Sequence, residues 1–472
     1  MGEWPKMIEK KWKIFSLVAV SIFMSTLDSS IVNVALPYIM RDMGTDISTI
    51  QWVVVIYLLT VSSLLLTFGR LSDIRGRRFI YVLGFLVFTL GSFFCGMAHT
   101  PFYLAMARVI QGIGASMLMA CSPALIVDVF ETAQRGRALG LLGAVVAAGL
   151  TLGPVAGGVL LEYFSWRFIF YINIPIGILA TLSGFFVLKR IPGGRGTGET
   201  LDWVGSLMMV VGLACFILCL TQVSAWGIVS FRFVLCLIIG CVACVGFVVN
   251  SRLSLHPLFD LNLLKIRLFV LPLAASGFLF AALFVIVFMM PFYLTYPCGL
   301  SPARTGGIMI VPFLFLLILS PVSGALSDRL GSQLLCSYGM ILLGGALVSL
   351  MSISPGMGTL SLVWRMSLAG MGTALFISPN NTAIMGAVPM AQRGIASGAS
   401  ATARNLGMVM GVALAGTIFT SSFSHLTQGT GLDNYTPAMV LNFMTSFKRV
   451  MVVGALVAFV GAVVTFARGK EE

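Results

Sequence analysis

The feature that most constrains this chain is a series of apolar segments, each about 20 residues long, that recurs along its whole length. A helix of this length spans the hydrocarbon core of a bilayer. Fourteen such segments are predicted, near residues 14–39, 49–69, 79–98, 101–127, 137–161, 166–188, 203–221, 231–249, 269–296, 304–326, 333–353, 358–380, 394–422 and 445–467. The chain is therefore expected to be an all-α membrane protein with 14 transmembrane helices.

Composition and charge exclude several other classes of protein. With 58% hydrophobic and 10% charged residues, the chain has too few charges to cover a soluble surface. The net charge of +13 does not indicate nucleic-acid binding, because the Lys and Arg residues form short clusters between apolar segments. The three His residues are scattered and the nine Cys residues lie almost all in apolar segments, so no metal site and no cofactor are predicted.

The distribution of positive charge predicts the topology. When loops are assigned alternately to the two sides, most of the 29 Lys and Arg residues fall on the side that holds both termini. Positively charged loops remain in the cytoplasm during insertion. Both termini are therefore expected to be cytoplasmic, in an inner (plasma) membrane of bacterial type.

Two polar motifs occur twice. The pattern G-x-L-S-D-x-x-G spans residues 69–76 and 324–331, and A-Q-R-G-x-A spans residues 133–138 and 391–396. Subtracting the residue numbers gives offsets of 255 and 258, so the order and spacing are kept. This indicates a duplicated six-helix unit with two additional helices between the copies. The predicted domains are an N-terminal six-helix bundle (1–188), a linker with two extra helices (189–268) and a C-terminal six-helix bundle (269–472).

Five segments carry a family resemblance: LDSSIVNVALP (27–37), GRLSDIRGRR (69–78), RVIQGIG (108–114), G-x-x-x-G-P-x-x-G-G (149–158) and WRFIFYINIPIG (166–177). Together they resemble the major facilitator superfamily, and within it the fourteen-span drug:proton antiporters of the EmrB/QacA type. The resemblance covers essentially the whole chain. It implies the major facilitator fold and drug:proton antiport. Alternating access, in which the duplicated halves rock about a midplane site, is the expected mechanism, and no enzyme activity is expected.

Two of these segments imply specific roles. The cytoplasmic gating motif consists of Gly69, Arg70, Asp73, Gly76 and Arg77. By resemblance, its Asp and two Arg residues tie the two halves together when the cavity opens outward; the alternative is a simple topology anchor.

The antiporter motif consists of Gly149, Gly153, Pro154, Gly157 and Gly158. Glycines four residues apart share one helix face and allow a neighbouring backbone to approach closely, and the proline permits a bend. By resemblance, the motif helps to seal the bundle against proton leak; tight packing alone is the alternative.

Asp28 is the strongest candidate for proton coupling, because it is the acidic residue that lies well inside a predicted span. If the first span ends near Pro37, Asp28 lies about 14 Å and Arg108 about 10 Å below the same boundary, so the two can meet. Burial favours the protonated acid and a nearby guanidinium favours the carboxylate, so approach and separation could load and release a proton. A static ion pair is the alternative.

The motifs that the sequence lacks bear on the energy source, and the polar residues in its spans are candidates for the cavity lining. The sequence has no GxxxxGK[ST] motif and no loop long enough for a nucleotide-binding domain, which favours secondary transport. Arg404 is a further candidate for the cavity, and the mostly neutral polar candidates for substrate binding are Asn33, Gln51, Trp52, Tyr57, Gln111, Asn173, Tyr293, Asn380, Asn381 and Asn405. No mid-span acid occurs in the last six predicted spans, which disfavours dicationic substrates.

The predicted function is proton-coupled export of amphipathic small molecules, monocationic or neutral, as in multidrug efflux. A dedicated exporter of an endogenous organic acid, amino acid or lipid remains an alternative. A channel would need a filter loop or pore-lining ring, and a membrane-bound enzyme would need clustered catalytic groups; neither pattern is visible. The expected partners are a small-molecule substrate, protons and the lipid bilayer, and binding of a periplasmic adaptor at the outer loop 425–442 stays open.

Overall fold

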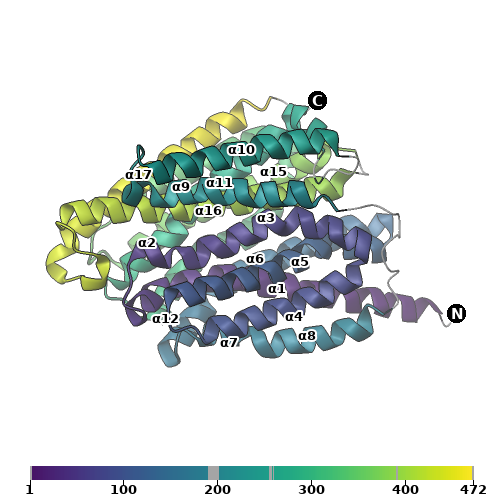
Figure 1. Cartoon of the computed structure of the whole chain (residues 1–472), viewed down its shortest axis with the longest axis horizontal. Coiled ribbons are helices and arrows are strands. Elements are labelled where there is room, and N and C mark those ends of the chain that lie inside the picture. Colours follow the sequence, from purple (N-terminus) through teal and green to yellow (C-terminus); the bar gives the residue numbers. More distant parts are fainter. Residues whose placement is uncertain (1–2, 190–200, 255–257, 259, 390–391, 470–472) are drawn as a thin grey trace.

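The structure is a computed structural model that describes residues 3–189, 201–254, 258, 260–389 and 392–469. These residues form α-helices and short 3-10 helices and contain no strand (Figure 1). Among them, 14 helical spans are long and apolar enough to cross a membrane. They coincide with the fourteen predicted segments, so the all-α membrane fold is confirmed.

The first part of the chain forms α1 (Glu3–Asp42), α2 (Ile47–Ile50), α3 (Trp52–Arg75), α4 (Arg77–Gly96), α5 (Pro101–Val129), α6 (Thr132–Tyr163), α7 (Phe168–Tyr171) and α8 (Asn173–Val187). The middle part forms α9 (Trp203–Trp226), α10 (Phe231–Leu253) and the 3-10 helix η1 (Leu261–Lys265). The last part forms α11 (Arg267–Thr295), α12 (Pro302–Met309), α13 (Val311–Leu330), α14 (Ser332–Leu350), α15 (Thr359–Gly386), α16 (Arg393–Leu426), η3 (Leu432–Asn434), η4 (Pro437–Met439) and α17 (Val440–Phe466).

Several boundaries differ from the sequence prediction. Three predicted spans consist of two consecutive helices each, with the breaks at Gln51, Ile172 and Ile310. The assumption that the first span ends near Pro37 is wrong, because α1 continues through this proline to Asp42. Proline removes only one backbone donor, and a membrane helix tolerates that loss. The predicted linker falls mostly on residues 190–200, which lie outside the described residues.

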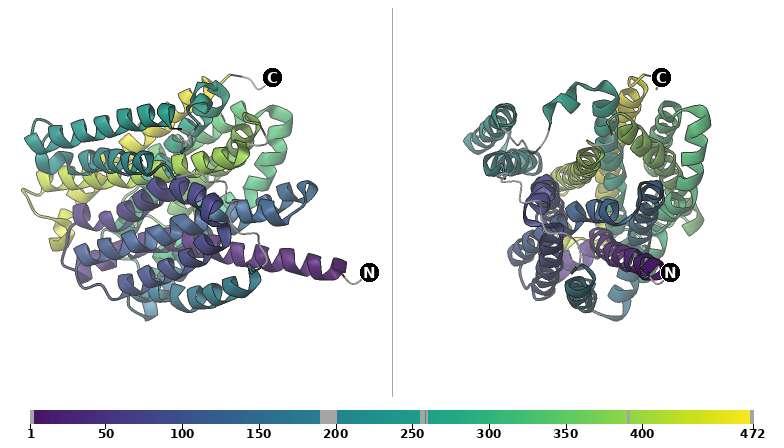
Figure 2. Two further views of the ribbon diagram at one scale, coloured as in Figure 1. Left: turned by 45° about the vertical axis from the view of Figure 1, so that its right-hand side comes forward. Right: turned by 90° about the vertical axis from the view of Figure 1, so that its right-hand side faces the viewer.

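The helices form two packed groups (Figures 1 and 2). In the first group α6 packs on α1, and α3 and α4 pack on α5; in the second, α16 packs on α11, and α13 and α14 pack on α15. The central position of α11 is evident from its side chains, which are all buried from Leu279 to Leu294. The α9 and α10 helices pack on each other, and α9 also lies on α3 and α16. We call the end of the bundle where α1 begins and α17 ends the terminal face, and the other end the far face.

The repeated G-x-L-S-D-x-x-G motif has the same backbone structure in both copies. Gly76 ends α3 with φ 97° and Gly331 ends α13 with φ 81°. Their amide groups donate to the carbonyl oxygens of Ser72 and Ser327, at 3.0 and 2.9 Å. Because a side chain disfavours such positive φ angles, glycine is required at both turns.

The glycine face of α6 packs directly on α1. A Cβ atom at Gly153 would lie 2.8 Å from the Cβ of Ser30, and one at Gly149 would lie 3.1 Å from the Cβ of Thr26. The Ser30 hydroxyl donates across this contact to the carbonyl oxygen of Leu150 at 2.9 Å. The antiporter motif therefore fixes the turn of α1 between Thr26 and Ser30.

At the far face the two groups meet at two equivalent places. On α6, Gly158 packs against α12, where a Cβ atom at Gly158 would lie 3.3 Å from the Cα of Gly306. On α16, Gly416 packs against Gln51, and a Cβ atom at Gly416 would lie 2.8 Å from its Cδ. The offsets of 258 and 255 residues relate Gly158 to Gly416 and Gln51 to Gly306. The duplication therefore generates both far-face contacts.

We call the two lines of contact between the halves, α3 with α16 and α6 with α12 and α13, the two seams. At the terminal face these seams differ. On α16, Gly398 packs against the side chain of Leu66 on α3. The equivalent residues in the other seam are Gly140 on α6, which has open space around its Cα, and Pro321 on α13, which is exposed. The seam between α3 and α16 is thus packed toward the terminal face, whereas the seam between α6 and α13 is open there.

Substitution of the turn glycines tests the need for positive φ. Gly76→Ala and Gly331→Ala should each lower stability by roughly 1–2 kcal/mol, because alanine is strained at this φ. Gly69→Ala is the matched control, because Gly69 is helical and has open space around it. Thermal unfolding of the purified protein in detergent measures the effect, and equal midpoints for all three variants would contradict it.

Substitution within α6 tests the contact with α1. Gly153→Ala should destabilise the protein by about 1–3 kcal/mol, because the new methyl group overlaps Ser30 and cannot be accommodated without a shift of α1. Gly143→Ala lies on the same helix with open space around it and serves as the control. An unchanged unfolding midpoint for Gly153→Ala would show that α1 and α6 can separate freely.

Candidate functional site

A pair of opposite charges is buried in the first group of helices. Asp28 lies on α1 and Arg108 on α5, both with an exposed fraction of 0%. The Arg108 Nη1 donates to the Asp28 Oδ2 and forms an ion pair. The two residues that the depth estimate expected to meet are in contact, even though α1 ends later than assumed.

Gln111 connects the pair to neighbouring helices. It lies one turn after Arg108 on α5, and its Nε2 donates to the Asp28 Oδ1 at 2.7 Å and to the Ser92 hydroxyl at 2.9 Å. Its Oε1 accepts from the Arg108 Nη1 at 2.6 Å. The Nδ2 of Asn173, at the start of α8, lies 3.3 Å from the Asp28 Oδ1. The carboxylate thus contacts side chains from α5 and α8, and Gln111 ties it to α4.

The guanidinium of Arg108 has two further partners. Its Nε donates to the carbonyl oxygen of Val53 on α3 at 3.0 Å. Its Cζ lies 4.0 Å from the ring centroid of Tyr57, within the range of a cation–π interaction. These contacts hold the arginine independently of Asp28.

Sequence reasoning missed three members of this site. Ser92 and Cys95 on α4 contact Gln111, the latter through its Sγ at 3.6 Å from the Gln111 Oε1. Gly91 allows the contact, because a Cβ atom there would overlap the backbone of Gln111. The available signal was the pair of small residues in an apolar segment, which marks close helix packing.

The other residues of the first half that were predicted to line the cavity do not contact the charged pair. The Nδ2 of Asn33 donates within its own helix to the Ser29 carbonyl at 2.7 Å. The Nε2 of Gln51 donates to the Ser48 carbonyl at 3.1 Å, and Trp52 is half-buried. Of the candidates from this half, only Tyr57, Gln111 and Asn173 contact the charged pair.

The candidates in the second half are also dispersed. Tyr293 donates to the Ser354 carbonyl at 3.0 Å, and the Asn380 Nδ2 donates to the Pro272 carbonyl at 3.0 Å. Asn381 is exposed and lies 3.5 Å from the Ser400 hydroxyl, while Asn405 is buried on α16. These residues form helix-packing contacts at several depths and do not form one cluster.

Two charged side chains of the gating motif, Asp73 and Arg77, pair within the first half. Arg77 forms ion pairs with Asp73, at 3.0 Å, and with Asp128 at the end of α5. Its Nη1 also lies 3.2 Å from the carbonyl oxygen of Ala124. The motif therefore ties α3, α4 and α5 together at the terminal face. Its predicted role between the two halves stays a prediction.

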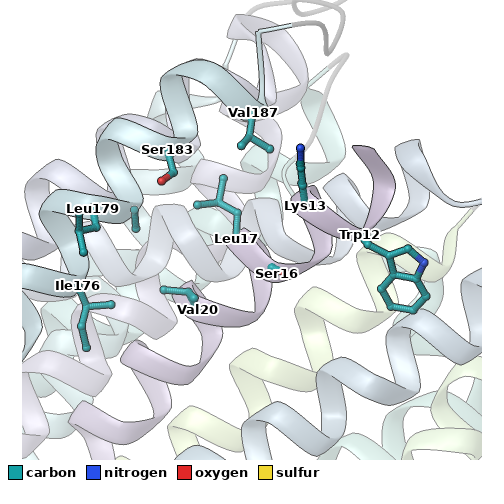
Figure 3. A pocket seen from close by; sticks show the side chains of 10 residues that line it. Trp12, Lys13, Ser16, Leu17, Val20, Ile176, Leu179, Ser183 and Val187 are labelled. Carbon is teal, nitrogen blue, oxygen red and sulfur yellow. The ribbon is translucent and has the colours of Figure 1, made fainter. Parts of the chain in front are cut away.

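A groove of about 610 Å³ lies between α1 and α8 (Figure 3). Its lining is mainly apolar and includes Leu17 and Val20 from α1 and Ile176 and Leu179 from α8. None of the residues that line it belongs to the charged cluster. Among the described residues there is also no group of three His, Cys, Asp or Glu side chains that could hold a metal ion.

Comparison with known proteins gives consistent matches. The Major Facilitator Superfamily profile matches residues 18–412. The riboflavin transporter RibZ of Clostridioides difficile is 32% identical over 97% of both chains. The multidrug resistance protein Stp of Mycobacterium tuberculosis is 32% identical over 87% of this chain and 77% of its own. The multidrug resistance protein 3 of Bacillus subtilis is 28% identical over 89% of this chain and 81% of its own.

Solved structures share the fold. A bacterial homologue of the human lysosomal transporter Spinster, solved in an inward-facing and unoccupied conformation, aligns with a TM-score of 0.67 over 97% of both chains at 14% identity. A peptide transporter of the POT type aligns with a TM-score of 0.68 at 16% identity, over 97% of this chain and 96% of its own. The protein is thus a multi-pass membrane transporter and not an enzyme, and the chain belongs to the major facilitator superfamily.

Proposed function

We propose that the protein exports amphipathic small molecules in exchange for protons by alternating access. The observation that carries this proposal is the fully buried pair of Asp28 and Arg108. An ionisable group in a membrane span is costly unless it has a function. One proton moving through 100 mV supplies about 2.3 kcal/mol, which is sufficient to couple to transport.

In the proposed cycle, Asp28 carries the proton. Protonation removes its negative charge and weakens its attraction to Arg108, which keeps its contacts with Val53 and Tyr57. The turn of α1 that holds Asp28 packs on the α6 glycines. A change in the charge of Asp28 therefore acts on the contact between α1 and α6, and α6 in turn contacts α12 of the other half.

Alternating access is supported by the packing of the two halves. They meet in both seams at the far face, whereas the seam between α6 and α13 is open toward the terminal face. Duplicated halves that rock about a central site are the expected mechanism of such transporters. We propose that the described conformation is open toward the terminal face. The ranges 1–188, 189–268 and 269–472 are proposed as the two moving bundles and the extra segment between them.

The bias of positive charge supports a cytoplasmic terminal face in an inner (plasma) membrane. The gating motif would then lie on the cytoplasmic side, and Asp73, Arg70 and Arg77 would join the halves in the outward-open state. The outer loop 425–442 would be the place for a periplasmic adaptor.

The substrate class rests on the relatives. Stp and the multidrug resistance protein 3 are named as multidrug proteins, which supports export of several different compounds. RibZ is named as a riboflavin transporter, which supports a dedicated exporter of one metabolite as the second candidate. A panel of riboflavin, lipophilic cations, neutral amphiphiles and organic acids distinguishes the two.

Replacement of Asp28 tests the proposed coupling. In proteoliposomes with a trapped pH indicator, addition of a transported compound should move protons with the wild type but not with Asp28→Asn, because the amide cannot carry a proton. Asp46→Asn is the matched control: Asp46 caps α2 through Thr49, and asparagine caps equally well. Undiminished proton movement with Asp28→Asn would exclude this residue as the carrier.

A reversible disulfide tests alternating access. A Cβ atom at Gly416 would lie 3.6 Å from the Cβ of Gln51, which is within the range for a disulfide. The double variant Gln51→Cys/Gly416→Cys should therefore form a disulfide that joins the halves at the far face. Oxidation should stop transport and reduction should restore it, while each single variant stays active under both conditions. Continued transport by the oxidised double variant would contradict alternating access.

A further inference from the structure

The second half contains a charged side chain that the proposed proton cycle does not use. Arg404 on α16 makes no hydrogen bond and no ion pair within the part of the chain that the structure describes. Other arginines in the spans have partners: Arg108 pairs with Asp28, and Arg365 donates to the Ser361 carbonyl at 2.7 Å. An arginine inside a membrane bundle normally pairs with an acid or with carbonyl oxygens. Arg404 is therefore a cation that could pair with a negatively charged group of a ligand.

The neighbours of α16 show which way Arg404 faces. Gly398 packs against Leu66 on α3 and Gly416 against Gln51, directly before α3, while Gly407 and Gly411 pack against α11. At 100° per residue, Arg404 lies on the face between these two contacts. Met410, which is 43% exposed, lies on the side turned away from it. The half-buried Arg404 thus lies on the face of α16 turned toward the other half of the molecule.

The depth of Arg404 suits a substrate site. It is 11 residues from the start of α16 at Arg393, which corresponds to about 17 Å along the helix axis. α16 has 34 residues and is about 51 Å long, so Arg404 lies about a third of the way along it from the terminal face, inside the span. Substrate sites of secondary transporters lie inside the membrane, between the two repeats.

A second free donor lies beside it. Asn405 is 4% exposed, and its Nδ2 has no hydrogen-bond partner among the described residues. On the helix, Arg404 and Asn405 lie on either side of the line through Ala401, one turn earlier. Between them, Ala401 contributes only a methyl group. A guanidinium and an amide on either side of a small residue match the oxygens of an oxyanion.

We propose that Arg404 and Asn405 form an anion-binding subsite, and that the transported compound is an amphipathic organic acid. The carboxylate, or a comparable oxyanion, binds between the two donors, and its apolar body lies in the space between the halves. That such an acid is transported rests on the proposed function, whereas its binding at this subsite does not. It replaces the expected monocationic or neutral substrate with an anionic one. Arg404 has no equivalent cation in the first half, where the related position is Val146.

The test compares three compounds with the same ring system: 1-naphthaleneacetate, 1-naphthaleneacetamide and 1-naphthylmethylammonium. Equilibrium dialysis of the purified full chain measures their dissociation constants. The wild type should bind the acetate at least about tenfold more tightly than the amide or the ammonium, because a charge-assisted hydrogen bond is lost in both. Arg404→Gln should abolish this preference, and Arg404→Lys should keep part of it. Asn405→Leu should reduce it.

Arg449→Gln is the matched control, because it removes the same charge from a residue whose partner is Ser422. It should leave the preference unchanged, and a thermal unfolding midpoint close to that of the wild type should show that each variant is folded. Equal binding of the three compounds, no binding of any of them, or a preference that survives in Arg404→Gln would overturn the proposal. Asp28→Asn should keep the preference, so a failure of proton coupling is distinguished from a failure of this subsite.

Discussion

The ion pair between Asp28 and Arg108 is the interaction on which the first half depends. Two buried charges are tolerated because each satisfies the other, and removal of one partner would leave a buried charge at a cost of about 3–5 kcal/mol. The surrounding helices are arranged to hold this pair. Glycines on α6 position the turn of α1 around Asp28, and Gly91 on α4 lets Gln111 approach. Small residues therefore determine the geometry of the charged ones.

The internal repeat is a second level of organisation. A contact made in one seam recurs at the equivalent place in the other, as Gly158 with Gly306 and Gly416 with Gln51 show. Charge does not follow this symmetry. The ion pair occurs in the first half and the isolated Arg404 in the second. The two related scaffolds thus carry different charged groups: an ion pair in the first half and, among the described residues, an arginine without an ion-pair partner in the second.

The sequence predicted those parts of the structure that have a strong physical signature. Apolar length identified the fourteen spans, and the cost of burying Asp28 and Arg108 singled out the charged site. Helix breaks such as Gln51 and the continuation of α1 past Pro37 were not predictable, because they depend on contacts between distant segments. Ser92 was missed because a neutral serine in a helix is equally compatible with packing.

The position of α9 has a mechanical consequence. Its Ser206 accepts from the Thr67 hydroxyl on α3 at 3.1 Å, and its Leu220 carbonyl lies 3.4 Å from the Thr417 hydroxyl on α16. One helix thus bonds to both sides of the seam between α3 and α16, whereas α6 and α13 are joined directly, by the Thr151 hydroxyl that donates to the Phe313 carbonyl at 3.2 Å. If the halves rock, the seam between α3 and α16 would act as the hinge, and the seam between α6 and α13 would open and close. A compound dissolved in the lipid would then reach the interior from one flank of the molecule only.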